Sequence, residues 1–384
     1  VQRLTFREVK SMDFTLKTFL VMLAIGSLAG WVMHRSDFCL TGMVRDVFLT
    51  RSFLLLRALL LSVVISTLTF EILRRFGVSI QVFGSPSAAH LLGGIGFGVG
   101  MTLAGSCVVG SVYRFGGGEV TGAATILGLI FGSLIFFELA IPISGFFKRI
   151  SLFEAATIPE LLGADPLYVV LPSALAGSLF IISWARGGKL TLKSFIPTYL
   201  QPWKAAVAIS FLGALSIFFF GTPISISTLY AKVATTIEAA IFPGHIARAS
   251  YFSKSVAIPL EFQGGSITIN NGPVTDTLFI AQGALFIGIF FGALFSAKMA
   301  GDYEVNFRIP PRQYLSAFAG GVIMAISARI AEGCNVWHLL GGLPYLSISS
   351  LLFLAGLFPG SYLGGLILKN RIIMTHGVEE LRGK

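Results

Sequence analysis

Three cysteines are the residues of this chain with the most distinctive chemistry. Cys39, Cys107 and Cys334 each lie in a short apolar segment interrupted by glycine. The chain has no Cys-x-x-Cys pair and no Cys/His spacing, which argues against a zinc site and a disulfide framework. A free cysteine is usually a small buried hydrophobe, but a thiol is also a weak, polarizable donor and acceptor. The presence of all three at glycine breaks favours thiols arranged along a narrow path.

Such a path suits a sulfur-containing anion. Strong donors would trap a hydrated dianion, whereas conduction needs binding firm enough for entry and weak enough for exit. A diffuse terminal sulfur accepts weak S–H donation at modest cost, and the N-termini of short helices add partial positive charge. The thiols must stay protonated, because a thiolate would repel the anion.

Cationic residues accompany the same segments. Intramembrane charges are candidates for function, although acidic neighbours make structural ion pairs an equally good interpretation. The anion-attracting candidates are Arg45, Arg114 and Arg329. Asn335 could also donate to a passing oxyanion or cap the short helix that follows it, and capping is the more common role. The glycines expected to break helices here are Gly42, Gly105, Gly110 and Gly333.

The composition indicates that these segments lie in a membrane. Of 384 residues, 54% are hydrophobic and 12% are charged, about half the charged fraction of a soluble protein. Apolar runs of about 20 residues are long enough to cross a bilayer. The net charge of +10 comes without a basic run interleaved with aromatics, so nucleic acid is not expected as a partner. We therefore predict an all-α polytopic membrane protein.

The apolar runs predict nine transmembrane helices, with the cysteine segments as short re-entrant helices between them. Re-entrant pieces are tolerated at membrane depth only when they are buried in protein or face a water-filled cavity. The predicted spans are 14–33, 53–73, 89–105, 120–147, 167–185, 204–221, 277–298, 313–331 and 346–368.

The two halves of the chain resemble each other. Gly93-Gly94 precedes Cys107 at the spacing at which Gly320-Gly321 precedes Cys334, and the motif GLIFGS at 128–133 is echoed by GLFPGS at 356–361. Four spans, a linker span and four spans (4+1+4) place the second half upside down relative to the first. This is the inverted-repeat plan of transporters, which bind substrate where broken helices meet.

The repeat implies a division of the chain, and part of the match is unequal. The region 222–276 corresponds to the Cys39 segment but has no cysteine. We interpret its polar insertion, about 240–275, as a loop or short surface helix. The distribution of Lys and Arg favours a cytoplasmic C-terminus. The expected parts are a basic N-terminal segment 1–13, a first repeat 14–150, a linker with the central helix 151–203, a second repeat 204–372 and a tail 373–384.

The segments SDFCLTGMVRD, AGSCVVGSVYRFGGGEVTG and AEGCNVWHLLGG closely resemble the YeeE/YedE family of bacterial inner-membrane proteins. The resemblance covers nearly the whole chain apart from the insertion and the N-terminus. It implies a multi-pass inner-membrane transporter of thiosulfate with an hourglass shape. It also implies that Cys39, Cys107 and Cys334 pass the anion by weak S–H contacts, and that a TusA-like sulfurtransferase protein acts as a partner on the cytoplasmic side.

Other functions stay open at this point. Some relatives are assigned to selenium metabolism, so a selenium-containing or other sulfur anion is an alternative substrate. A membrane-bound sulfurtransferase that uses the cysteines covalently is a second alternative, and a structural or sensory subunit is a third. The chain has no P-loop motif, so we expect no ATPase in it. We also expect no enzyme activity, no catalytic residues, no cofactor and no metal.

Overall fold

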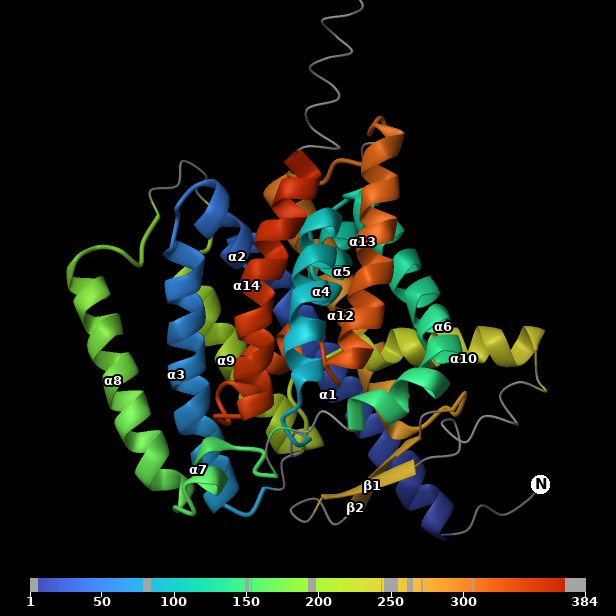
Figure 1. Ribbon diagram of the computed structural model, residues 1–384, viewed down its shortest axis with the longest axis horizontal. Helices are drawn as coiled ribbons and strands as arrows, with labels where there is room; N and C mark the ends of the chain where they lie inside the picture. Colours follow the sequence, from blue (N-terminus) through green and yellow to red (C-terminus); the bar gives the residue numbers. More distant parts are fainter. Residues whose placement is uncertain are drawn as a thin grey trace, which may run out of the picture.

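The computed structural model describes residues 6–78, 84–148, 152, 154–192, 198–242, 244, 255–260, 265–270, 272–305 and 307–369. These residues form a bundle of long helices that run mainly vertically in Figure 1, with short helices between them and a small hairpin at the lower side. The helices and strands are α1 (Phe6–Ser36), α2 (Leu40–Leu49), α3 (Leu54–Arg75), α4 (Ala88–Ala104), α5 (Val108–Gly116), α6 (Val120–Lys148), α7 (Ile158–Leu161), α8 (Pro166–Arg186), α9 (Pro202–Phe220), α10 (Ser227–Ile241), β1 (Ser255–Leu260), β2 (Gly265–Asn270), α12 (Thr277–Ala300), α13 (Pro311–Ile330), the π-helix η2 (Trp337–Gly342) and α14 (Ile348–Leu368).

The predicted spans are confirmed. Within the described residues, nine helical segments are long and apolar enough to cross a membrane, and each overlaps one predicted span. The first and third of them join a long helix to the short helix after it, α1 with α2 and α4 with α5. The protein is a multi-pass, predominantly helical membrane protein.

Glycine brings the most extensively packed helices into close contact. The main pairs are α1 with α12, α4 with α14, α6 with α13 and α4 with α13. A β-carbon added at Gly30 of α1 would lie 2.2 Å from the carbonyl oxygen of Ile289, and one at Gly94 of α4 would lie 2.3 Å from that of Phe353. Helices in lipid associate by such backbone approach, because lipid provides no hydrophobic drive between them.

Two further glycine contacts join positions that are equivalent in the predicted repeat. A β-carbon at Gly128 of α6 would lie 2.2 Å from the carbonyl oxygen of Phe318 on α13, and one at Gly356 of α14 would lie 2.2 Å from that of Leu91 on α4. Gly128 and Gly356 are equivalent in the predicted repeat, and so are Phe318 and Leu91. The same close approach therefore occurs twice. In one contact the glycine belongs to the first half of the chain, and in the other it belongs to the second half.

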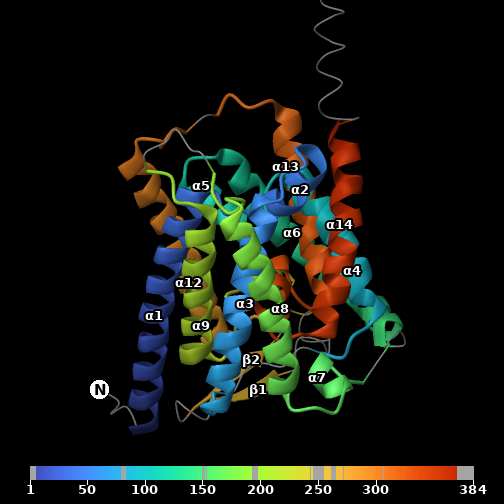
Figure 2. The ribbon, with the colours of Figure 1, turned by 90° about the vertical axis from the view of Figure 1, so that its left-hand side faces the viewer.

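The helices α1 and α9 run in opposite directions and touch each other. The backbone N–H of Leu200, just before α9, donates to the carbonyl of Arg35 near the end of α1 at 2.9 Å. The Tyr199 hydroxyl donates to the Ser36 carbonyl at 3.1 Å. Burial and then the carboxylate of Asp37 raise the pKa of Tyr199, so this tyrosine stays a hydroxyl donor. Figure 2 shows α9 beginning at the upper side, where α1 ends.

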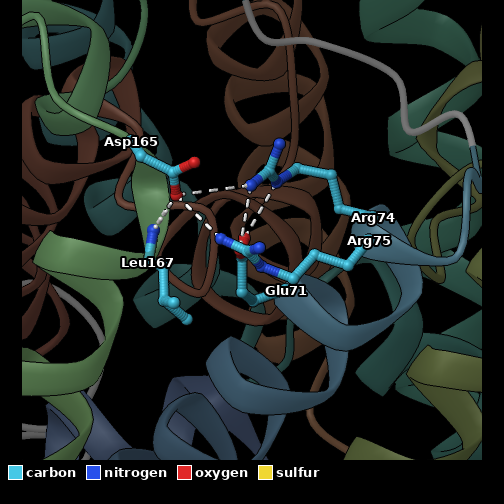
Figure 3. A network of polar contacts seen from close by, with 5 residues as sticks. All are labelled: Glu71, Arg74, Arg75, Asp165 and Leu167. Atoms are coloured by element: carbon cyan, nitrogen blue, oxygen red, sulfur yellow. Dashed lines mark hydrogen bonds and ion pairs between the residues drawn. The ribbon is translucent and has the colours of Figure 1, made fainter.

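The linker helix α8 lies at the edge of the bundle, and a polar network fastens it to α3 (Figure 3). Glu71 accepts from Arg74 at 2.8 Å and from Arg75 at 2.9 Å. Arg75 also donates to Asp165, the N-cap residue of α8, at 2.9 Å. A cavity of about 200 Å³ between α3, α7 and α8 opens beside this network, and no cysteine lines it.

The polar insertion contains a β-hairpin, so the expectation of a loop or short surface helix there was wrong. β1 and β2 pair antiparallel from Ser255 opposite Asn270 to Leu260 opposite Gly265. β-branched residues occur in both strands, Val256 and Ile258 in β1 and Ile267, Thr268 and Ile269 in β2. They favour strand over helix, and the polarity of the insertion concealed that pattern. Residues 245–254, 261–264 and the tail 373–384 lie outside the described residues.

Candidate functional site

Each cysteine lies directly before a short helix. Cys39 is the N-cap residue of α2, Cys107 is the N-cap residue of α5, and Cys334 precedes the helical turn that leads into η2. Their exposed fractions are 4%, 2% and 0%, and all three are free thiols. The structure thus places all three at helix breaks inside the protein.

The three breaks share one backbone conformation. The residue two positions before each cysteine has a positive φ, +47° at Asp37, +70° at Gly105 and +56° at Glu332. A left-handed residue ends the preceding helix and turns the chain. Glycine adopts this conformation freely, whereas Asp and Glu do so at a cost. Only Gly105 was expected to have this role from the sequence.

The breaks bring the thiols together. A β-carbon at Gly110 of α5 would lie 3.2 Å from Cys107 Sγ and 3.8 Å from Cys39 Sγ. The Gly110 N–H also donates to Cys107 Sγ at 3.2 Å. Cys39, Cys107 and Cys334 belong to one buried cluster of side chains, and a charge on either of the other two cysteines would act on the Cys107 thiol. Cys107 is therefore the middle member of the group.

The side chain of Asn335 lies in the same group, beside the Cys107 thiol. It is fully buried at 0% exposure. Even so, neither its Nδ2 nor its Oδ1 has a partner with hydrogen-bond geometry among the described residues. The expectation that Asn335 caps the following helix was therefore wrong. A buried carboxamide that has only a weakly accepting thiol beside it is costly and calls for an explanation.

Two tyrosines border the thiols, and sequence reasoning missed both. Tyr113 of α5 interacts with Cys39 and Cys107, and its hydroxyl donates to Asp37 at 3.5 Å. Tyr230 of α10 interacts with Cys107 and Cys334 and donates to the Val108 carbonyl at 3.4 Å. Tyr113 lies in the same segment of the sequence as Cys107. Tyr230 lies on α10, far from every cysteine in the sequence, so no sequence signal marked it.

The three arginine candidates have different surroundings. Arg45 pairs with the adjacent Asp46 at 3.0 Å. Arg114 pairs with Glu119 at 3.4 Å, and a β-carbon at Gly105 in the break before Cys107 would lie 3.9 Å from its Nη1. Its Nε is buried without a partner among the described residues. Arg329 donates to the backbone carbonyl of Ser227 at 2.7 Å. Arg114 thus carries its charge beside a cysteine break.

The predicted break glycines divide into two groups. Gly105 and Gly333 lie in the breaks before Cys107 and Cys334. Gly42 and Gly110 lie inside α2 and α5, so they do not break helices, and that expectation was wrong for both. Glycine serves close packing as well as helix breaks in membranes, and at Gly110 it leaves room for two sulfur atoms.

The helix break between α9 and α10 lies beside the third thiol. Ser225 Oγ is 3.9 Å from Cys334 Sγ and 3.3 Å from Ser227 Oγ. A small cavity with room for about one water molecule borders this region, with Ser227, Tyr230 and Arg329 in its wall. Among the described residues, no group of three or more His, Cys, Asp and Glu side chains is placed to hold a metal ion.

Comparison with known proteins matches this arrangement to a family. The model of the sulphur-transport family matches residues 35–363, a range that contains all three cysteines and their helix breaks. The chain belongs to the sulphur-transport family.

Relatives in the sulphur-transport family include two proteins named thiosulfate transporter TsuA. The one from Spirochaeta thermophila is 28% identical over 354 residues, covering 88% of this chain and 94% of the relative. The one from Escherichia coli is 26% identical over 324 residues, covering 82% of this chain and 84% of the relative. A probable transporter YedE from Escherichia coli is 27% identical over 162 residues, covering 41% of this chain and 39% of the relative. The resemblance to YeeE/YedE proteins is thus confirmed.

Proposed function

We propose that the protein imports thiosulfate across the bacterial inner membrane along a path formed by Cys39, Cys107 and Cys334. The observation that carries the proposal is the group of buried thiols, each at a helix break and each within reach of Cys107. The names of the TsuA relatives support thiosulfate as the substrate. The transporter family also supports a carrier over an enzyme.

The chemistry of the group fits passage of this anion. Thiosulfate has a polarizable terminal sulfur and three oxygens, so thiols can hold it by weak donation at the sulfur and release it again. The short helices α2 and α5 begin at Cys39 and Cys107. Their N-termini contribute partial positive charge without a fixed cation. Weak and repeated binding permits conduction, whereas one strong cationic site would retain a dianion.

The unpartnered carboxamide of Asn335 supports a substrate position between Cys107 and Cys334. Its two amide hydrogens can donate to the oxygens of the anion while Cys107 donates to the terminal sulfur. The cost of burying an amide without a partner is then offset whenever an anion occupies this position. We assign Arg114 to attraction of the anion toward Cys39 and Cys107, since its guanidinium lies beside Gly105 in the break before Cys107.

The proposal includes the inverted repeat. It pairs α1–α6 with α9–α14 around the linker helix α8. The antiparallel course of α1 and α9 and the matched contacts of Gly128 and Gly356 support it. In this arrangement the breaks of the two halves approach the middle of the membrane from opposite sides. We expect a TusA-like protein to receive thiosulfate on the cytoplasmic side, where we place the C-terminus.

Uptake of radiolabelled thiosulfate into proteoliposomes tests the function. We expect uptake by the purified protein, reduced uptake after Cys107→Ala or Cys334→Ala, and unchanged uptake in the control Ser210→Ala. Ser210 is a buried serine that hydrogen-bonds Ser62, away from the thiols. Unchanged uptake with both cysteines replaced would reject the thiol path.

Mass spectrometry of the protein after turnover separates the path from a covalent sulfurtransferase. The path predicts three free thiols after exposure to thiosulfate. A persulfide or a mixed disulfide on any of the cysteines would favour the sulfurtransferase instead. Competition of uptake by selenium-containing and other sulfur anions then identifies the preferred substrate.

A further inference from the structure

The break between α9 and α10 has no cysteine, although it corresponds to the Cys39 break in the proposed repeat. α9 ends at Phe220 and is followed by Gly221 with φ +68°, and α10 begins at Ser227. The backbone therefore turns here with a left-handed residue, as it does before each cysteine. The connection is longer than the one between α1 and α2, and it carries serines.

Ser225 of this break lies beside Cys334, the counterpart of Cys107 in the proposed repeat. Its hydroxyl lies 3.9 Å from Cys334 Sγ, and the side chain is 5% exposed. On the other side of the group, Cys39 and Cys107 share the space left by Gly110. In the proposed repeat each half thus contributes two sulfur or oxygen donors to this region.

We propose that Ser225 is a fourth substrate-binding group, next to Cys334, and that it donates to the oxygens of the anion. This inference rests on the proposed transport of thiosulfate along the thiols. A hydroxyl is a stronger and harder donor than a thiol and prefers oxygen acceptors. At Ser225 the sulfonate end of thiosulfate is therefore held, while Cys334 faces the terminal sulfur.

The surroundings of Ser225 fit an anion. Arg329 donates to the carbonyl of Ser227, two residues further on, and so brings a cation to this break. The N-cap residue of α10, Ile226, has no side-chain bond to the first turn of the helix, where Gln282 accepts from the Leu229 N–H at 2.8 Å. The unpartnered carboxamide of Asn335 is an independent observation beside Cys334 that points to a ligand.

Kinetics of thiosulfate uptake in proteoliposomes test the role of Ser225. Loss of one hydrogen bond in Ser225→Ala raises KM by about three- to tenfold. Ser225→Cys recovers most of that loss, because a thiol restores a donor. The matched control Ser210→Ala keeps the wild-type KM. A wild-type KM in Ser225→Ala would overturn the proposal.

Crosslinking tests the position of Ser225 independently of kinetics. Copper phenanthroline with oxygen takes two electrons and two protons from the thiols of Ser225→Cys and Cys334 and joins them in a disulfide. We expect a mass loss of two hydrogens, loss of uptake and recovery of uptake on reduction with dithiothreitol. Absence of the disulfide, or full uptake with it formed, would overturn the proposal.

The two experiments separate this inference from the proposed function. If Cys107→Ala and Cys334→Ala transport normally, the thiol path fails and Ser225 fails with it. If both cysteine variants lose uptake while Ser225→Ala transports with the wild-type KM, the path stands and only the fourth binding group is rejected.

Discussion

The two ends of the thiol group differ in chemistry, although the proposed repeat gives them equivalent positions in the two halves. At one end Cys39 and Cys107 lie against Gly110, and Arg114 carries a charge toward them. At the other end Cys334 lies beside Ser225. Close glycine contacts between long helices occur in both halves, since a β-carbon at Gly128 or at Gly356 would meet a backbone carbonyl. This difference indicates that close helix packing restricts which residues the long helices can have at their contacts. At the helix breaks the donor groups can vary.

Replacement of the middle thiol has the largest expected effect. Cys107→Ala removes the group that interacts with both other thiols, so we expect thiosulfate uptake to fall to background. Cys39→Ala removes an end member and leaves slow uptake. Initial uptake rates in proteoliposomes measure both. Equal effects of the two substitutions would contradict the middle position of Cys107.

The matched packing of the two halves predicts matched losses of stability. Gly128→Ala and Gly356→Ala each press a methyl group against a carbonyl oxygen, and each should lower the free energy of unfolding by about 1–3 kcal/mol. The control Gly365→Ala has nothing within 4 Å of its added β-carbon. Thermal unfolding in detergent measures the three variants. A clear loss in only one of the first two would argue against the repeat.

Filling the space at Gly110 should obstruct the Cys39 end alone. Gly110→Ala places a methyl group 3.2 Å from Cys107 Sγ and 3.8 Å from Cys39 Sγ, and we expect uptake to fall about tenfold, the equivalent of 1.4 kcal/mol. Gly213→Ala on α9 is the control, since its added β-carbon meets nothing within 4 Å. Undiminished uptake by a folded Gly110→Ala protein would show that the anion does not pass these two sulfurs.

Asn335 lies between the Cys107 end and the Cys334 end of the thiol group. Its amide should affect anion binding more than folding. Asn335→Ala removes a donor to the anion and also removes an unpartnered buried amide. We therefore expect KM to rise about fivefold while thermal stability stays equal or increases. Asn335→Asp keeps the shape and adds repulsion of the anion, so it should transport less than Asn335→Ala. A fall in stability without a change in KM would indicate a structural role.

The arginine at the Cys39 end should give the smallest effect. Arg114→Gln removes a partly exposed charge, so uptake at low salt should fall about two- to threefold through weaker steering. The difference from wild type should vanish at high ionic strength, where exposed charges are screened. Uptake measured across a salt series checks this. A difference that persists at high salt would assign Arg114 to direct binding instead.

The spans and the re-entrant cysteine segments could be predicted from the sequence, because their signals are length and apolar composition. The β-hairpin was missed because a strand of six residues is a weaker signal than the polarity around it. Gly42 and Gly110 were assigned to breaks because glycine has two uses in membrane helices. The turns at Asp37 and Glu332 carry no sequence signal, since those residue types rarely adopt positive φ.

The site could be predicted only in part for a related reason. Cysteines in three distant segments were recognisable by their type and glycine neighbours. The pairing of Ser225 with Cys334 depends on where α10 begins, which tertiary packing decides. The unpartnered state of Asn335 is likewise a property of its surroundings, and sequence analysis assigned it the more frequent capping role.

An experimental structure with thiosulfate bound, with sulfur located by anomalous scattering, tests the central claim most directly. Our account predicts a pair of sulfur peaks that belong to no residue, in contact with Cys107 and beside Asn335. Thiosulfate bound elsewhere, with the three thiols enclosed by protein alone, would contradict it.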